Sequence, residues 1–237
     1  MLDSHLTGFD SAFIALLNSR IYHFDTLEST QTYAIEMIKE DKLNVPFCIS
    51  AKTQSNAIGS RGNQWDSVPK SLLFSFALPL KSLPQDLRLE SSSIFFGVIM
   101  REYLRSLGSQ VWLKYPNDLY RTDSKIGGIL TQKVKGNIVC GIGINLYSAN
   151  TEQNTQYATL EETISANIEP VRFLEDFFKS FENFVSWKQI FSIYKLEFYK
   201  NSSFFFHLGK ERMCLKDAIL NEDGSLSIDG NKIYSLR

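Results

Sequence analysis

Two lysines, an asparagine and an aspartate stand close together in one stretch and could bind an anion. Lys114, Asn117 and Asp118 flank Pro116 at the end of an apolar run, and Lys125 follows shortly after. Proline fixes its own φ and favours an extended residue before it, so a strand should end here. Asn and Asp directly after proline favour a tight turn. Two ammonium groups near one point suit a phosphate or a carboxylate, so the stretch predicts an anion site at the rim of a sheet.

Glycines recur in the two strand-like runs that come next. Gly127 and Gly128 follow Lys125 in the first run, and the second run ends in the sequence Gly-Ile-Gly-Ile-Asn at 141–145. A glycine inside a strand lets another backbone or a ligand approach closely. We therefore expect a ligand to lie against these strands, beside the two lysines.

The composition narrows the class of protein. The chain has 237 residues, 43% hydrophobic and 22% charged, which is typical of a packed globular core. Its net charge of −1 provides no general attraction to nucleic acid. Three widely spaced cysteines give neither a disulfide framework nor a zinc site, which fits the reducing cytoplasm. The apolar patch at 12–17 has no basic residue before it and Asp3 and Asp10 beside it, so we expect no signal peptide, and no run is long enough to span a membrane.

Strands and helices can be placed around these residues from the hydrophobic pattern. The pattern predicts strands at 21–24, 46–51, 71–80, 111–115, 125–135 and 137–146, and helices at about 30–39, 87–107 and 169–198. The last of these is one long helix or a helix pair. Residues 1–19 form a short helix or a flexible extension, 52–65 a polar loop, and 147–167 a surface excursion. From residue 202 onward, short strands and turns form a module too small to be stable alone.

Five motifs in this order resemble those of biotin–protein ligases. They are a Ser-Thr helix start at Ser29, a Gly/Arg loop closing on Trp65, Lys-Tyr-Pro-Asn-Asp from Lys114, Lys-Ile-Gly-Gly-Ile-Leu from Lys125, and Gly-Ile-Gly-Ile-Asn ending at Asn145. The lysine motifs at this separation are the specific part of the signal. The resemblance covers roughly residues 21–200, and the small C-terminal module is similar to the one that follows the catalytic domain there. Repressor-type members begin with a DNA-binding domain, which we do not expect in this single-function class.

The resemblance implies a fold and a division into domains. The fold is α/β (α+β), with a mixed β-sheet catalytic domain flanked by helices and then a small SH3-like β-barrel module. Residues 1–20 would be an N-terminal extension, 21–200 the biotin- and adenylate-forming domain, and 201–237 the barrel.

The resemblance also implies a reaction and a set of site residues. Biotin and ATP, with Mg²⁺, would give biotinyl-5′-adenylate and pyrophosphate, and a lysine of a biotin carboxyl carrier domain would then take the biotinyl group. By matched position, the biotin-binding residues are Ser29, Thr30, Gln31, Gln54, Gly59, Ser60, Lys125 and Gly127. The ATP- and adenylate-binding residues are Ile58, Gly59, Ser60, Arg61, Trp65, Asn117, Lys125 and Asn145. Catalytic roles are implied for Lys125, Lys114, Asp118 and Arg61, and Asp118 would also hold magnesium through water.

Several of these residues have an ordinary structural interpretation as well. Lys114 and Lys125 could be solvated lysines at strand ends. Asp118 could bond its own backbone in a turn. Ser29 is a natural helix cap, and Trp65 could belong to the core.

The loop before Trp65 departs from the family pattern. Three positions that usually hold arginine are Ile58, Ser60 and Asn63 here, so Arg61 supplies the loop's positive charge. Backbone N–H groups of the glycines from Gly59 onward can still form an anion-binding nest.

Other functions compete with this interpretation. A lipoate ligase or octanoyltransferase of the same fold would carry an Arg-Arg-x-Ser-Gly-Gly-Gly stretch, and the transferase needs a nucleophile for which Cys140, in mid-strand, is poorly placed. A non-catalytic biotin-binding protein would explain the altered loop. A DNA-binding regulator is disfavoured by the charge. The expected partner is a carrier domain of the acetyl-CoA carboxylase or pyruvate carboxylase type, with neither nucleic acid nor membrane, and homodimerisation is left open.

Overall fold

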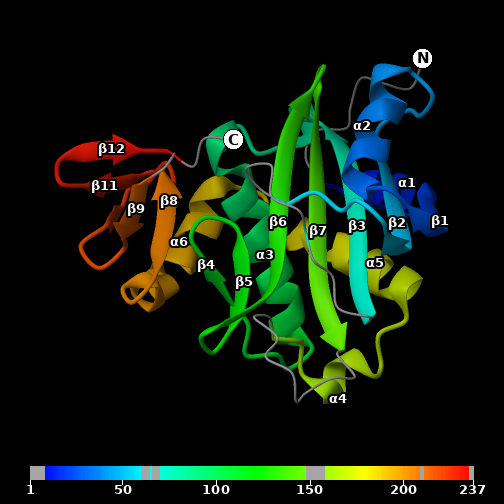
Figure 1. Ribbon diagram of the computed structural model, residues 1–237. Helices are drawn as coiled ribbons and strands as arrows, with labels where there is room; N and C mark the ends of the chain where they lie inside the picture. Colours follow the sequence, from blue (N-terminus) through cyan, green and yellow to red (C-terminus); the bar gives the residue numbers. More distant parts are fainter. Residues whose placement is uncertain (1–8, 60–64, 66–69, 148–157, 209–210, 235–237) are drawn as a thin grey trace.

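A seven-stranded mixed sheet lies at the centre of the protein (Figure 1). The computed structural model describes residues 9–59, 65, 70–147, 158–208 and 211–234. The strands are β1 (Ile21–Leu27), β2 (Phe47–Gln54), β3 (Lys70–Pro79), β4 (Trp112–Lys114), β5 (Asp118–Arg121), β6 (Ser124–Val134) and β7 (Asn137–Tyr147). Their order is β1-β2-β3-β7-β6-β5-β4, with β1 and β2 parallel and the other neighbours antiparallel. The predicted mixed sheet is confirmed.

Helices cover the two faces of this sheet unequally. The described helices are α1 (Ser11–Asn18), α2 (Thr30–Lys39), α3 (Ser92–Ser106), α4 (Glu162–Ser165), α5 (Pro170–Lys179) and α6 (Trp187–Glu197), with short 3-10 turns η2 (Leu80–Ser82), η3 (Leu89–Ser91), η4 (Ser180–Asn183) and η5 (Phe198–Asn201). Figure 1 shows α1, α3, α5 and α6 behind the sheet and α2 in front of one end of it. Among the described helices, α2 alone lies on the front face (Figure 1). No helix within the described ranges is long and apolar enough to cross a membrane.

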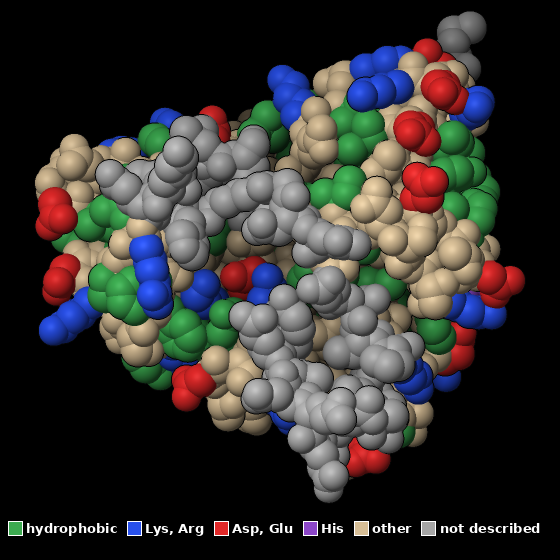
Figure 2. All heavy atoms as spheres, in the orientation of Figure 1, with side chains coloured by type: hydrophobic (Ala, Val, Ile, Leu, Met, Phe, Trp, Pro, Cys, Tyr) green, Lys and Arg blue, Asp and Glu red, His purple; other side chains and the backbone are tan. Residues whose placement is uncertain are grey.

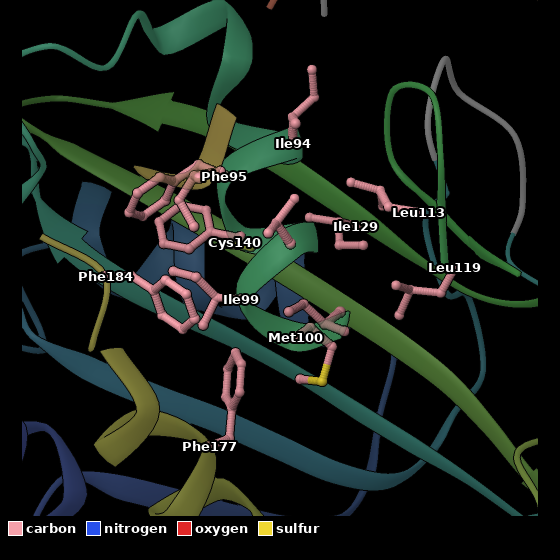
Figure 3. Packing of buried hydrophobic residues seen from close by; sticks show 14 of the residues in the cluster. Ile94, Phe95, Ile99, Met100, Leu113, Leu119, Ile129, Cys140, Phe177 and Phe184 are labelled. Carbon is pink, nitrogen blue, oxygen red and sulfur yellow. The ribbon is translucent and has the colours of Figure 1, made fainter. Parts of the chain in front are cut away.

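The alternation of β3 shows how one strand serves both faces. Phe74 and Phe76 point into the main core, where Phe177 of α5 packs edge-on against both rings. Figure 3 shows Phe177 beneath α3, whose residues include Ile99, beside the sheet. Ala77, of opposite parity, packs under α2 in a second, smaller core. Because successive side chains in a strand point to opposite faces, Ser75 lies on the same face of the sheet as Ala77.

The N-terminal helix belongs to the main core. Phe13, Ile14 and Leu17 are buried there, and Asp10 caps the helix by accepting a hydrogen bond from the backbone N–H of Phe13 at 2.8 Å. Residues 11–18 are thus a packed helix. The division of the chain at residues 20 and 200 stays a prediction.

The C-terminal strands form two small antiparallel sheets. One contains β8 (Phe205–Leu208) and β9 (Glu211–Cys214), and the other β10 (Ile219–Leu220), β11 (Leu226–Ile228) and β12 (Asn231–Ile233). Phe206, Leu215 and Leu226 are buried in the same core as the main sheet. The indole N–H of Trp187 also donates to the backbone oxygen of Glu222 at 2.6 Å. As expected for so small a unit, these strands pack against the rest of the chain.

Three sequence-based boundaries were wrong, and one segment expected at the surface contains a buried residue. The loop expected from residue 52 starts later, because β2 continues to Gln54 in parallel pairing with β1. The helix expected from residue 87 begins at Ser92, after the 3-10 turn η3. Asp118 was expected inside a turn but begins β5, opposite Lys114 of β4. The excursion at 147–167 includes Leu160, which is 1% exposed.

Candidate active site

A cavity of about 450 Å³ lies on the same face of the sheet as α2, beside the start of that helix. Its lining residues come from α2, β2, β3, β6, β7 and the loops near them: Ser29, Thr30, Gln31, Gln54, Ala57, Ile58, Gly59, Trp65, Leu73, Phe74, Ser75, Asn117, Lys125, Gly128, Ile129, Leu130, Gly141, Ile142 and Gly143. Figure 2 shows the hollow on this face, where basic and acidic side chains meet. The volume suits a small organic ligand.

One end of the cavity is closed by polar side chains that hold one another. The hydroxyls of Thr30 and Ser75 lie 2.9 Å apart, and Oε1 of Gln54 accepts the backbone N–H of Thr30 at 2.6 Å. Gln31 is 4% exposed; its Nε2 donates to the backbone oxygen of Val139 at 3.5 Å, whereas its Oε1 has no hydrogen-bond partner among the described residues. A buried acceptor without a partner costs free energy, so Gln31 is poised for a donor on a ligand.

Ser29 combines capping with its place in the cavity wall. Its backbone is extended and its hydroxyl accepts the N–H of Thr32 at 3.3 Å, which begins α2 at Thr30. A hydroxyl oxygen with one lone pair used can still donate its proton. The cap therefore places a donor at the cavity without losing its structural role.

Glycines form the floor of the cavity. Gly128 of β6 pairs with Gly143 of β7, and an added Cβ at either position would meet the indole of Trp65, at 3.2 Å from Gly128 and 3.0 Å from Gly143. At Gly141 an added Cβ would lie 2.7 Å from Oε1 of Gln31. Side chains here would fill the space that the cavity occupies, so the glycines keep it open.

The charged rim is a carboxylate between two ammonium groups. Asp118 Oδ1 lies 2.7 Å from Nζ of Lys125, and its Oδ2 lies 3.5 Å from Nζ of Lys114. Nζ of Lys125 is also 5.3 Å from the ring centre of Trp65. Two cations with one anion leave a net positive charge at the edge of the cavity, which favours an anionic ligand.

Asn117 fixes the hairpin that presents this charge. Its Nδ2 donates to the backbone oxygen of Ile129 at 2.8 Å, and its own backbone oxygen accepts the N–H of Ile129 at 2.8 Å. The peptide bond between Tyr115 and Pro116 is cis. Asn117 thus joins the β4–β5 turn to β6 and also lines the cavity.

Asn145 is fully buried behind the charged rim. Its Nδ2 donates to the backbone oxygen of Ala158 at 3.3 Å, and its Oδ1 has no hydrogen-bond partner in the part of the chain that the structure describes. The N–H of Ala158 donates to the backbone oxygen of Lys125 at 2.9 Å, and the N–H of Leu160 to that of Asn145 at 2.8 Å. Residues 158–160 therefore bind to β6 and β7, the strands that carry Lys125 and Asn145.

Most of the expected site residues meet at the cavity. Those that line it are Ser29, Thr30, Gln31, Gln54, Ile58, Gly59, Trp65, Asn117 and Lys125. Asp118 contacts Lys125 at the rim, and Lys114 lines a neighbouring hollow with Tyr120 and Arg212. Gly127 faces the core and not the cavity: a Cβ added there would lie 3.3 Å from Cδ1 of Leu119. Ser60, Arg61 and Asn63 lie outside the described residues.

Ser75 and Gly128 line the cavity but were not assigned to the site from the sequence. Ser75 lies inside the apolar run 71–80 and looks unremarkable there, although small residues at alternate positions, Ser75 and Ala77, mark one face of the strand. Gly128 could not be told from its neighbour Gly127, because adjacent strand residues face opposite sides and the register decides which side is the cavity.

The described residues do not form a dedicated metal site. No group of three His, Cys, Asp or Glu side chains among them could hold an ion. Asp118, the expected magnesium ligand, already has both oxygens near ammonium groups. An ion here would depend mainly on oxygens of a bound ligand.

The buried thiols are not nucleophiles. Burial, together with the neighbouring Cys48, raises the pKa of Cys140 well above its usual range. The thiolate is the reactive form of cysteine, so Cys140 stays protonated and inert. The chemistry of this cavity must come from its hydroxyl, amide, ammonium and carboxylate groups.

Comparison with known proteins agrees with this geometry. The biotin/lipoate A/B protein ligase family matches residues 23–147. A biotin acetyl coenzyme A carboxylase synthetase from Helicobacter pylori, with bound biotinylated ATP, is 42% identical and covers 91% of this chain and 99% of its own, with a TM-score of 0.83. A biotin protein ligase from Aquifex aeolicus in complex with biotin and ATP, 22% identical over 91% of this chain and 94% of its own, shares the fold with a TM-score of 0.71.

A curated relative matches over a smaller part. The bifunctional ligase/repressor BirA of Escherichia coli is 34% identical over 146 residues, which is 57% of this chain and 44% of that protein. The chain therefore spans about half the length of the curated relatives it matches. The family match covers the strands and the α2 segment that build the cavity, and the chain belongs to the biotin/lipoate A/B protein ligase family.

Proposed function

We propose that the protein activates biotin with ATP to biotinyl-5′-adenylate and transfers the biotinyl group to a lysine of a biotin carboxyl carrier domain. The observation that carries the proposal is the closed polar end of the cavity beside a cationic rim. The ureido ring of biotin has N–H donors and one carbonyl acceptor, which match the free acceptor of Gln31 and the hydroxyls of Thr30 and Ser75. The Helicobacter relative, with biotinylated ATP in its structure, supports the same assignment.

In the first step, a carboxylate oxygen of biotin attacks the α-phosphorus of ATP, and the bond to the bridging oxygen breaks to release pyrophosphate. Negative charge collects on the oxygens around phosphorus, and a fixed cation there stabilises the transition state. Lys125 is our candidate because its ammonium lies at the rim of the cavity, held by Asp118 at 2.7 Å. Lys114, on the other side of Asp118, would attract the departing phosphates.

The adenylate would lie from the closed end across the glycine floor. Trp65 and Gly59 line that path, and Ile58 stands at its edge. Asn145 would offer its free Oδ1 to an adenine amino group. Ser60 and Arg61, outside the described residues, remain candidates for phosphate contacts. Magnesium would arrive with ATP, since this ion keeps several waters and binds mainly to substrate phosphates.

In the second step, the amine of the carrier lysine attacks the acyl carbon, and the bond to the phosphate oxygen breaks to release AMP. The amine loses a proton in this step, so a base near the mixed anhydride assists it. Asp118 is our candidate because it lies at the rim beside Lys125, where an incoming side chain would arrive. The carrier would be of the acetyl-CoA carboxylase or pyruvate carboxylase type.

Lipoate and octanoate are the nearest rival substrates. Neither a dithiolane ring nor an alkyl chain can donate to Gln31, so the buried acceptor would stay unpaired. A site built to bind a polar group rejects analogues that lack it, because its buried polar atoms lose their partners. A protein that binds biotin without turning it over is the other alternative.

Biotin-dependent exchange of labelled pyrophosphate into ATP tests the first step, with lipoate and octanoate as controls. We expect exchange with biotin alone. Exchange that is equal or faster with lipoate would assign the rival substrate. Biotin binding measured in a calorimeter, without any exchange, would indicate a non-catalytic biotin-binding protein.

A further inference from the structure

Asn201 makes a buried contact with the hairpin that carries the charged rim. It ends η5, after α6 and before the C-terminal strands, and is 0% exposed. Its Oδ1 accepts the backbone N–H of Tyr115 at 2.8 Å, and its Nδ2 donates to the backbone oxygen of Phe198 at 3.1 Å. One amide therefore ties the end of β4 to η5.

Tyr115 is the residue between Lys114 and the turn. Its ring is buried and packs edge-on against Phe198, with centroids 6.4 Å apart, and against Phe206, at 5.8 Å. Both the backbone and the ring of Tyr115 are thus held from outside the central sheet. The position of the hairpin depends on these contacts as well as on its pairing with β6.

Ion pairs join the segment that carries Asn201 to α3. Glu197, at the end of α6, forms ion pairs with Arg101 and Arg105 of α3, and Arg101 is buried. Burial of Glu197 would raise its pKa, but the hydrogen bond and charge of Arg101 outweigh this effect and hold the pKa below its ordinary value. The carboxylate therefore stays charged at neutral pH and keeps η5 fixed against α3.

We propose that Asn201 is a positioning residue, which sets the lysine–carboxylate cluster of Lys114, Asp118 and Lys125 through the backbone of Tyr115. The inference rests on the proposed function. Lys114 directly precedes Tyr115, and Asp118 lies opposite Lys114 across the hairpin. A shift of this turn would therefore move the carboxylate that holds Lys125. Asn201 bonds Tyr115 and Phe198. The closed end of the cavity is built instead from Thr30 and Gln31 of α2 and Ser75 of β3, with no hydrogen bond to Asn201 in the described part of the chain.

Removal of this contact should separate catalysis from biotin binding. Asn201→Ala should lower the maximal rate of pyrophosphate exchange by about 10- to 100-fold, since small displacements of reacting groups have effects of this size. The Kd for biotin should stay within about twofold of wild type. The control is Asn221→Ala, which removes the 3.0 Å and 2.9 Å hydrogen bonds to Ser225 and Ser227 inside the C-terminal module. A parallel loss of biotin affinity and rate, or an unchanged rate, would overturn the proposal.

A second measurement does not depend on the activity. Competitive labelling with an amine reagent, read by mass spectrometry, reports the exposure of Lys114, whose side chain is 11% exposed. Asn201→Ala should raise the labelling of Lys114 several-fold, whereas Asn201→Asp, which keeps the acceptor for Tyr115, should preserve its protection. Equal labelling in wild type and Asn201→Ala, or in the two variants, would overturn the positioning role. Absence of exchange in the wild type with the labelling change intact would instead refute only the proposed function.

Discussion

Gly141→Ala tests the closed end of the cavity, because it adds a single methyl group there. An ideal Cβ at Gly141 lies 2.7 Å from Oε1 of Gln31 and 3.1 Å from Oγ of Ser75. At such separations one of the two side chains must move. The Gln31 amide can rotate, because it is the end of a flexible side chain, whereas the Ser75 hydroxyl is held 2.9 Å from that of Thr30. We therefore expect Gln31 to turn away.

Gly141→Ala should weaken biotin binding more than it lowers the free energy of unfolding. Rotation relieves the overlap, so the free energy of unfolding should fall by about 1 kcal/mol, the low end for an overpacked interior. A ligand loses its hydrogen bond to the displaced acceptor and meets the new methyl group. A lost hydrogen bond in a buried site costs about 1–3 kcal/mol. The Kd for biotin should accordingly rise by about 5- to 150-fold.

Titration calorimetry with biotin measures this change, and thermal unfolding checks the fold. Gly136→Ala is the matched control, because a Cβ at Gly136, in the β6–β7 turn, meets nothing within 4 Å. Its Kd should equal that of wild type. A Gly141→Ala protein that binds biotin with wild-type affinity would refute the assignment of the ring to the closed end.

Three further changes probe the rim and the helix support. Lys125→Ala should lower pyrophosphate exchange by about 100-fold or more with an unchanged melting temperature, because it removes the fixed cation; near-wild-type exchange would exclude Lys125 from the step. Ile58 is 44% exposed at the cavity edge, so Ile58→Arg should tighten binding of a non-hydrolysable biotinyl-adenylate analogue by about tenfold, and an unchanged Kd would mean that this position faces away from phosphate. Glu197 has a lowered folded pKa, so its stabilisation is complete above the ordinary value of 4.5 and lost as the pH falls through the folded pKa. Glu197→Gln should therefore destabilise the protein by about 1–2 kcal/mol at neutral pH, in urea titrations, because Arg101 keeps its ion pair with Glu102, and it should flatten the loss of stability in acid; an unchanged acid profile would contradict the role of this ion pair.

The sequence predicted the cavity mainly through residues that stand at strand and helix ends. Lys125, Asn117 and Ser29 could be placed because proline, glycine and capping residues mark where elements stop. Hydrophobic periodicity also gave the strands and the apolar helices, since a buried face needs a repeating pattern.

What the sequence could not provide was register and pairing. The choice between Gly127 and Gly128, the place of Ser75 and the parallel extension of β2 to Gln54 all depend on which strands are neighbours. The contact between Asn201 and Tyr115 is equally invisible, because the two residues are far apart in the chain and neither has a distinctive local pattern. These features arise from tertiary structure.

Mass spectrometry of a biotin carboxyl carrier domain, incubated with this protein, biotin and ATP, tests the central claim most directly. The account predicts one biotinyl group per carrier, attached to its acceptor lysine, and no modification when ATP is omitted, when lipoate replaces biotin or when that lysine is replaced by arginine. An unmodified carrier in the complete mixture, or a carrier modified equally well with lipoate, would contradict it.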